Sequence, residues 1–262
     1  MELHHRTLRL EEGFRVGVTS VGAGTPLVFL HGLSLSTRAY EELLIALAGQ
    51  GFRVIGLDAA DHGRTDSLPW GHSVSDMAEV TARTLTALGV DEAVMVGHSM
   101  GGGMVVEFAA RYPARTAAAI LVNAAAGAEH HAGLRMRPCT TVACWAGMKL
   151  ARAALDVVND GRHAARLRSG AAQRGLVATL RSSFSGLRCL RAARALMKAD
   201  TVPLLQRLHA NGVPTAVIHG ELDKIVPFRA GAGAARTAGA RLYPSPAPSI
   251  LGCSPTLSER AG

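Results

Sequence analysis

Aromatic residues, cysteines and long apolar runs are all scarce in this sequence. Aromatic residues make up 4% of the chain, so there are few platforms on which nucleic-acid bases would stack. No apolar stretch approaches the roughly 20 residues of a membrane-spanning helix, and the charged residues 1–13 lack the apolar core of a secretory signal. No cysteine pair has CxxC spacing, which gives no indication of a zinc site or a disulfide framework; the four are Cys139, Cys144, Cys189 and Cys253. We therefore expect a soluble, cytoplasmic protein with no transmembrane segment.

The length and the apolar content indicate a folded protein. The chain has 262 residues, of which 48% are hydrophobic and 18% charged. Chains that stay disordered are poor in apolar residues, so that class is excluded. At roughly 150 residues per domain, this length predicts one or two domains, and the apolar content is sufficient for one large core.

The net charge of +8 comes from one segment of the chain. Residues 128–210 hold 12 Arg and 2 Lys against 4 acidic residues, whereas acidic residues slightly outnumber basic ones elsewhere. The segment has few aromatic residues and no nucleic-acid-binding motif, so we expect no nucleic-acid partner. The simpler interpretation is a solvated helical face. The alternative is attraction of anionic substrates, or a weak contact with an anionic surface.

Outside that segment, short apolar runs alternate with segments of helical periodicity. The predicted strands are residues 15–21, 26–30, 53–57, 93–96, 117–122, 214–218 and 241–243. The predicted helices are residues 36–48, 75–88, 100–112 and 228–237. This order predicts an α/β fold, in which a mostly parallel central sheet has helices on both faces.

Residues 128–210 interrupt the alternation. They are rich in Ala, Arg and Leu and contain no convincing strand, so they predict several helices. The simplest organisation is a core of residues 1–127 and 211–243, a helical cap insertion of residues 128–210, and an irregular Pro/Ser-rich tail of residues 244–262.

Ser99 is the first candidate for chemistry. It lies in Gly97-His98-Ser99-Met100-Gly101, a match to G-x-S-x-G directly after a predicted strand and directly before a predicted helix. A sharp turn in that context exposes the serine hydroxyl above the sheet, and the flanking glycines avoid clashes with neighbouring elements. The following helix N-terminus favours developing negative charge. We interpret Ser99 as a nucleophile, with an ordinary structural turn as the alternative.

Two further positions lie just past predicted strands. His31-Gly32 ends the strand of residues 26–30, and a glycine there lets the backbone approach a ligand closely. The N–H groups of Leu33 and Met100 would then form an oxyanion hole, unless this is an ordinary strand-end turn. Asp223 follows the strand of residues 214–218, at the edge where parallel sheets bind ligands. Its carboxylate would orient and stabilise an imidazolium, or else cap a loop.

Together these motifs resemble the α/β-hydrolase superfamily over residues 7–243. The matching motifs occur in the order typical of that family: strand-His31-Gly32, the loop from Asp58 to Thr65, Gly97-His98-Ser99-Met100-Gly101-Gly102, and His219-Gly220 to Asp223. The resemblance implies an esterase or lipase-type member, a single domain with a helical cap. A serine at the elbow, rather than an aspartate, argues against haloalkane dehalogenases and epoxide hydrolases of this fold.

The resemblance also implies roles for individual residues. It implies Ser99 as nucleophile, Asp223 as acid, and the backbone N–H groups of Leu33 and Met100 as oxyanion donors. In relatives the loop of residues 58–65 chiefly shapes the rim of the site, so we expect His62 to be structural rather than catalytic. The supporting positions are His31, Gly32, Gly97, His98 and Gly101.

The sequence departs from the superfamily at its general base. Relatives place a histidine after the last strand, and none of the eleven histidines here follows Asp223. Residues 244–262 contain four Pro, four Ser and two Gly, a composition that disfavours the closing helix of relatives. We therefore expect that helix to be absent, one sheet face to be partly uncovered, and solubility to be poor.

Three hypotheses for the base stay open. In the first hypothesis, the chain descends from an active hydrolase whose reading frame is shifted or truncated after about Tyr243. Alternatively, another histidine replaces the missing one, with His219 nearest to Asp223 and the insertion supplying the other candidates, His130, His131, His163 and His209. In the third hypothesis the chain is a non-catalytic, ligand-binding pseudo-hydrolase that uses the same cleft.

The function we predict is a serine hydrolase that cleaves a carboxylic ester or similar small acyl substrate through an acyl-enzyme on Ser99. This chemistry needs no metal or organic cofactor, and the sequence suggests none: its Gly-Ala-Gly runs at residues 22–24 and 231–233 are not dinucleotide fingerprints. Lactone, thioester, amide and carbon–carbon cleavage stay open, because the inner face of residues 128–210 sets substrate choice. The sequence carries no signal of oligomeric state.

Overall fold

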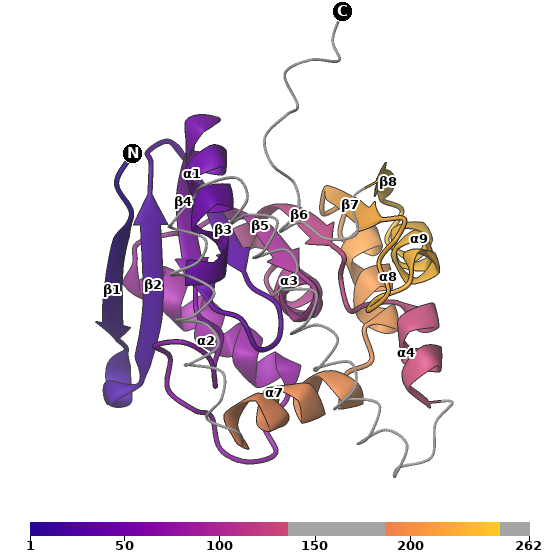
Figure 1. Cartoon of the computed structure of the whole chain (residues 1–262), viewed down its shortest axis with the longest axis horizontal. Helices are drawn as coiled ribbons and strands as arrows, with labels where there is room; N and C mark the ends of the chain where they lie inside the picture. Colours follow the sequence, from indigo (N-terminus) through magenta and orange to yellow (C-terminus); the bar gives the residue numbers. More distant parts are fainter. Residues whose placement is uncertain (136–186, 247–262) are drawn as a thin grey trace, which may run out of the picture.

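The computed structural model describes residues 1–135 and 187–246 (Figure 1). Within these residues one eight-stranded sheet has the order β1-β2-β4-β3-β5-β6-β7-β8. β1 and β4 are antiparallel to β2, and all other neighbouring pairs are parallel. The strands are β1 His4–Arg9, β2 Arg15–Val21, β3 Thr25–Leu30, β4 Phe52–Leu57, β5 Ala93–His98, β6 Thr116–Val122, β7 Thr215–Gly220 and β8 Arg241–Ser245.

Helices follow most of the parallel strands. They are α1 Glu41–Gly49, α2 Val74–Ala87, α3 Met100–Arg111, α4 Ala128–Arg135, α7 Leu187–Lys198, α8 Val202–Ala210 and α9 Phe228–Thr237. Short 3-10 helices occupy Glu11–Gly13, Thr37–Tyr40 and Pro113–Arg115. The predicted α/β class with a mostly parallel sheet is therefore confirmed.

One strand, β1, was not expected from the sequence. Its six residues, HHRTLR, show no apolar alternation, and all but Leu8 are exposed. Backbone pairing with β2 places this strand at the edge of the sheet, in register from His4 opposite Ser20 to Arg9 opposite Arg15. An edge strand has few buried side chains, so pairing rather than apolar pattern forms it.

The helix expected over residues 36–48 is divided in two. A 3-10 helix over Thr37–Tyr40 precedes α1, and Ser36 at its N-cap makes no side-chain capping bond. By contrast, α2 begins with a full capping box: the Ser73 hydroxyl accepts from the Asp76 N–H, and the Asp76 carboxylate accepts from the Ser73 N–H. Reciprocal satisfaction of these two N–H groups explains why α2 begins at Val74.

The two faces of the sheet are covered unequally. The larger core packs α2, α3, α8 and α9 on one face. The smaller core lies on the other face, around Phe29, Tyr40 and Leu44. Within the described part of the chain, the only helical residues in this core come from α1 and the 3-10 helix before it. Ile120 and Ile218, on β6 and β7, are only half-buried on that side. The expected absence of a closing helix concerns residues 244–262. Of these, residues 247–262 lie outside the described residues.

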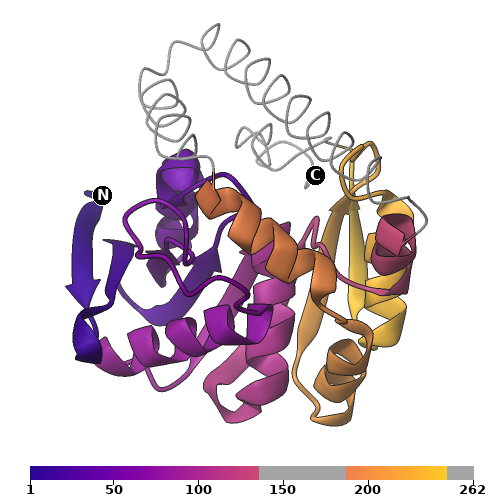
Figure 2. The same ribbon diagram turned by 90° about the horizontal axis from the view of Figure 1, so that it is seen from below.

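The described part of the insertion is helical, as the sequence predicts. α8 packs against α3 and α9, and α7 crosses the molecule beside α2 (Figure 2). Arg191 of α7 donates to the carbonyl oxygen of Leu68 at 3.2 Å and lies over the Trp70 ring, 5.5 Å from its centroid. The boundaries between core, cap and tail stay a prediction. Outside the described residues lie Cys139, Cys144, His163 and most of the basic residues of the insertion.

No helix within residues 1–135 and 187–246 is long and apolar enough to cross a membrane.

Candidate active site

Ser99 occupies a strained turn between β5 and α3. Its φ of 53° and ψ of −114° lie in a region of backbone conformation that residues other than glycine rarely adopt. The Ser99 N–H donates to the carbonyl oxygen of Val122 at 3.0 Å, and its own carbonyl oxygen accepts from the N–H groups of Gly102 and Ala125. Bonds to two neighbouring segments therefore hold the strained conformation, with the side chain half-buried at the carboxyl end of β5.

The glycines on both sides of Ser99 are required by close backbone approach. A Cβ on Gly97 would lie 2.2 Å from the carbonyl oxygen of Gly101, and a Cβ on Gly101 would lie 2.1 Å from that of Leu30. Both distances are far below van der Waals contact, and both partners are backbone atoms that cannot rotate away. The steric interpretation of the G-x-S-x-G motif is thus seen in the packing.

The loop after β3 is held near this turn by His62. The Ser34 N–H donates to Nε2 of His62 at 3.2 Å, and Nδ1 of His62 contacts the carbonyl oxygen of Ala60 at 2.9 Å. These contacts fit a neutral ring protonated on Nδ1. His62 is buried, and both of its ring nitrogens contact backbone atoms. Its contacts are those of a structural residue that supports the loop containing Leu33.

His31 ties the end of β3 to the end of β4. Its Nδ1 contacts the carbonyl oxygen of Gly32 at 2.8 Å, and its Nε2 accepts from the Ala59 N–H at 2.9 Å. Burial lowers the pKa of His31, against the raising effect of Asp58. His31 therefore supports the loop as a neutral ring.

Asp58 organises the first turn of the rim loop. Its carboxylate accepts from the N–H and hydroxyl of Thr37 and from the N–H of Arg64, and the Arg64 Nε lies 3.5 Å away. Burial raises the pKa of Asp58, but His31 and these hydrogen bonds outweigh it, and the net direction is downward. A charged Asp58 thus joins β4, the rim loop and the Thr37 turn.

His98, the residue before Ser99, is paired with Tyr40. The Tyr40 hydroxyl lies 2.8 Å from Nδ1 of His98 and accepts from the Gly32 N–H at 3.3 Å. Burial lowers the pKa of His98 to about 4, with smaller contributions from His31 and His219. Burial also raises the pKa of Tyr40, so a neutral phenol donates to a neutral imidazole.

Asp223 lies in a tight loop after β7. Its Oδ1 accepts from the N–H groups of Ile225 and Val226 at 2.7 and 3.0 Å, and its own N–H donates to the carbonyl oxygen of Gly220 at 3.2 Å. The side chain is half-buried. The loop-cap contacts are therefore present, and they hold the carboxylate at the carboxyl end of β7.

Backbone contacts connect the Ser99 turn to the Asp223 loop across β6. Ser99 bonds to Val122, and the next residue, Asn123, donates its N–H to the carbonyl oxygen of Ile218 at 2.9 Å. The Asn123 side-chain oxygen accepts from the Gly220 N–H at 2.9 Å. Ser99 and Asp223 therefore lie at the same edge of the sheet, where parallel strands end.

His219, the weak candidate for a base, is engaged elsewhere. Its Nε2 lies 2.8 Å from the carbonyl oxygen of Val226, so this nitrogen donates. Its Nδ1 is buried and has no hydrogen-bond partner among the described residues; it faces Gly231 of α9, where an added Cβ would lie 2.2 Å away. A ring sealed between a strand and a helix holds the Asp223 loop and is not exposed to a substrate.

The described insertion histidines are also placed in packing roles. Nε2 of His131 accepts from the N–H of Thr201 at 3.0 Å and lies 2.8 Å from its hydroxyl. The His130 ring packs edge-on against His131. His209 lies against Gly239, at the far end of α8. None of these three takes the position after the last strand that the superfamily uses.

Two positioning residues, Tyr40 and Asn123, were not predicted from the sequence. Tyr40 is part of a segment expected to be helical, and Asn123 directly follows a strand without any motif. The one local signal for Asn123 is its backbone, because φ of 45° is tolerated by Asn better than by most residues. The partners His98 of Tyr40 and Gly220 of Asn123 are both distant in sequence.

Within the described residues, no group of three or more His, Cys, Asp or Glu side chains is arranged to hold a metal ion.

Comparison with known proteins places the fold in a family. A profile described as alpha/beta hydrolase fold matches residues 25–235, most of the chain. The chain belongs to the α/β-hydrolase family. The G-x-S-x-G turn that carries Ser99 at the end of β5 is a sequence feature typical of this family.

Individual relatives of this α/β hydrolase include haloperoxidases and esterases. A protein of Mycobacterium phage D29, named as a candidate non-heme haloperoxidase, is 55% identical over 241 residues, covering 92% of this chain and 87% of that protein. A non-heme haloperoxidase of Rhodococcus erythropolis is 28% identical, covering 86% of this chain and 85% of that protein. The crystal structure of an esterase from Rhodococcus sp. ECU1013 has a TM-score of 0.70 at 25% identity, covering 96% and 94% of the two chains. These relatives support a hydrolase as the general class.

Proposed function

We propose that this α/β hydrolase is a serine hydrolase that cleaves a carboxylic ester or similar small acyl substrate through Ser99. The observation that carries the proposal is the Ser99 conformation, φ 53° and ψ −114°, at the junction of β5 and α3. Strain of this kind persists only where the surrounding structure enforces it, and here backbone bonds to β6 and the following loop do so.

The proposed first step is acyl transfer. The Ser99 Oγ attacks the substrate carbonyl carbon and loses its proton to a base, and the alcohol leaves with a proton. Water then hydrolyses the acyl-serine and releases the carboxylic acid. The N–H groups of Leu33 and Met100 are the proposed donors to the oxyanion, since Met100 is the first residue of α3 and Leu33 lies in the loop that His62 supports.

The base is the weak step of this mechanism. No histidine follows Asp223 in the sequence, and the ring of His219 is engaged with Val226. Loss of a triad member typically lowers kcat by roughly 10⁴- to 10⁶-fold. The oxyanion donors and substrate binding would still leave roughly 10³- to 10⁴-fold acceleration over water. We therefore expect slow, Ser99-dependent turnover of activated esters.

The proposal is tested with a fluorophosphonate probe and a panel of short and medium acyl esters. Wild type, Ser99→Ala and Ser20→Ala are compared, because Ser20 is also half-buried but lies at the opposite end of the sheet. We expect labelling in wild type and Ser20→Ala and none in Ser99→Ala. Imidazole added to the buffer should accelerate the Ser99-dependent ester hydrolysis. Equal labelling of wild type and Ser99→Ala overturns the proposal.

The runner-up is a ligand-binding protein that uses the same cleft without turnover. The absence of a histidine after Asp223 favours it. It predicts saturable binding of short acyl amides with no labelling and no imidazole effect. The frame hypothesis is examined separately by sequencing the DNA across codons 243–262: a clean frame that encodes no histidine in either alternative frame contradicts it.

We also propose that the basic charge of residues 128–210 attracts a small anionic acyl substrate. Ester hydrolysis rates measured at low and high salt with neutral and anionic esters test it, because attraction of an anionic substrate weakens with salt.

A further inference from the structure

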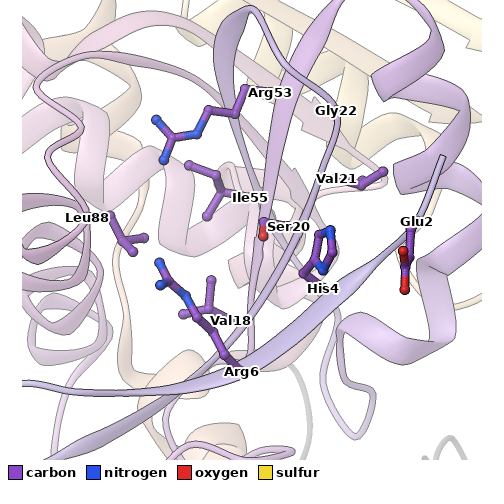
Figure 3. Close-up of a pocket in the computed structure, with 10 residues that line it drawn as sticks. All are labelled: Glu2, His4, Arg6, Val18, Ser20, Val21, Gly22, Arg53, Ile55 and Leu88. Carbon is purple, nitrogen blue, oxygen red and sulfur yellow. The ribbon is translucent and has the colours of Figure 1, made fainter.

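A cavity lies over the antiparallel part of the sheet, and Figure 3 shows the residues that line it. It has a volume of about 190 Å³ and lies over β1, β2 and β4, beside Leu88 at the end of α2. β2 is antiparallel to β4, so its residues near Ser20 lie beside the amino end of β4. The Ser99 turn follows the carboxyl end of β5, so the two sites occupy opposite edges of the sheet.

Strand register explains how the polar residues meet there. His4 pairs with Ser20, and Ser20 pairs with Ile55. Side chains two positions apart in a strand share a face, so Arg6 lies on the His4 face and Arg53 on the Ile55 face. Residues from three strands thus form one cluster on the sheet face that α2 covers (Figure 3).

The two guanidinium groups of this cluster have no partner among the residues that the structure describes. In the part of the chain that the structure describes, neither the Arg6 nor the Arg53 side chain has a hydrogen bond or an ion pair, whereas Arg15 pairs with Asp66 at 2.8 Å. The one carboxylate at the cavity, Glu2, lies on the other side of His4 from both guanidinium groups (Figure 3). Two cations that line one cavity, with no counter-ion among the described residues, favour the binding of an anion there.

The lining also contains the polar residues His4 and Ser20 and a smaller set of apolar side chains. Val18, Ile55 and Leu88 form the main apolar part, and Leu88 is the residue that follows α2 (Figure 3). The volume is below the roughly 300 Å³ at which pockets for drug-sized ligands begin. Its occupant is therefore small, with a charged head and at most a short carbon chain.

We propose that this cavity binds a small organic oxyanion, whose carboxylate or phosphate head lies between Arg6 and Arg53 and whose short carbon chain packs on Ile55 and Leu88. Guanidinium groups match such heads because their N–H donors form parallel bonds to two oxygens. The site is independent of the proposed chemistry at Ser99.

Titration calorimetry with butyrate and with inorganic phosphate tests the proposal. Wild type is compared with Arg6→Gln, Arg53→Gln and Arg9→Gln. Arg9 is the matched control: it is exposed on the same strand, loses the same charge, and points to the opposite face. Butyramide, which has the chain but no charge, is the control ligand. Circular dichroism melting of each variant checks that it folds.

We expect saturable butyrate and phosphate binding in wild type and in Arg9→Gln. Arg6→Gln and Arg53→Gln should each weaken it by roughly tenfold, and butyramide should not bind. Leu88→Ala should weaken butyrate but leave phosphate unchanged, which separates head from chain. No saturable binding of either anion at about 50 mM overturns the proposal. Equal weakening in Arg9→Gln and Arg53→Gln also overturns it, because general charge would then explain the effect.

A carboxylate is also the product of the proposed Ser99 reaction, so binding there must be distinguished. Butyrate titration of Ser99→Ala does this: binding that persists in Ser99→Ala and is lost in Arg53→Gln belongs to the cavity lined by Arg6 and Arg53. Binding that depends on Ser99 and not on Arg53 overturns this proposal while supporting the proposed function.

Discussion

The Tyr40 hydroxyl lies 2.8 Å from Nδ1 of His98, immediately behind the strained Ser99 turn. The same oxygen accepts from the Gly32 N–H, so one phenol joins the end of β5 to the loop after β3. These are the two segments that carry the proposed oxyanion donors and the proposed nucleophile. Tyr40 is therefore a positioning residue for the whole candidate site.

Removal of this hydroxyl should destabilise the protein. In Tyr40→Phe, the buried Gly32 N–H and Nδ1 of His98 lose their partner, and we expect the free energy of unfolding to fall by about 1–3 kcal/mol. Urea denaturation measures it. Tyr112→Phe is the control, because the Tyr112 hydroxyl donates to Glu79 at an exposed site. Loss of that hydroxyl should lower the free energy of unfolding by less than about 1 kcal/mol. Equal losses in the two variants would contradict the buried bridge.

Stability should rise with pH between about 4 and about 6.5. Burial lowers the pKa of His98 to about 4, whereas the unfolded chain has an ordinary histidine pKa near 6.5. The unfolded state therefore binds the extra proton across this window, so that acidification favours unfolding; above it the contribution of His98 is complete.

Chemical denaturation at several pH values measures this slope. His98→Gln should make it shallower without abolishing it, because burial also lowers the pKa of His31. A slope of the same size in His98→Gln would show that His98 is not responsible.

The Ser99 turn should tolerate no side chain at Gly101. The Cβ of Gly101→Ala would lie 2.1 Å from the carbonyl oxygen of Leu30, so we expect a loss of about 2 kcal/mol or more in unfolding free energy. Fluorophosphonate labelling of Ser99 should fall with it, because the turn must shift.

Gly49→Ala is the matched control for this substitution. Gly49 ends α1, and the nearest atom to an added Cβ is 3.8 Å away. There alanine should be neutral or stabilising by up to about 1 kcal/mol. Thermal melting of both variants decides the matter, and a neutral Gly101→Ala would refute the close packing described.

Arg191 should hold α7 against the segment of residues 68–70. It donates to the Leu68 carbonyl oxygen and lies over Trp70. Arg191→Ala should lower stability by about 1 kcal/mol and speed proteolysis near α7. Arg194→Ala, on an exposed part of the same helix, should change neither. Identical digestion patterns for the two variants would rule out this anchoring role.

Local pattern was sufficient for most elements of the fold. The apolar runs before residues 30, 57, 98 and 122 were long enough to define buried parallel strands, and Pro113 marked the end of α3. β1 was missed because an edge strand buries little and shows no alternation. The helix over residues 36–48 is broken because the Thr37 N–H and hydroxyl bind Asp58, a residue distant in sequence.

The candidate site divides in the same way. Ser99 and its glycines are recognisable in sequence because a sharp strand-to-helix turn has strict local requirements. The contacts of His219 could be seen only in the tertiary structure, where its Nε2 bonds to Val226 and its Nδ1 faces Gly231 of α9. The parts played by Tyr40 and Asn123 likewise depend on partners far away in the chain.

By itself, the order of residues determined the alternation of strands and helices, the bend at Ser99 and the lack of a histidine beyond Asp223. These follow from short-range sterics and from residue identity. Only the tertiary structure decided which side chains are neutral, which hold loops, and that Arg6 and Arg53 line one cavity with no counter-ion among the described residues. Burial and long-range strand pairing set those properties, and neither is encoded in a local window of sequence.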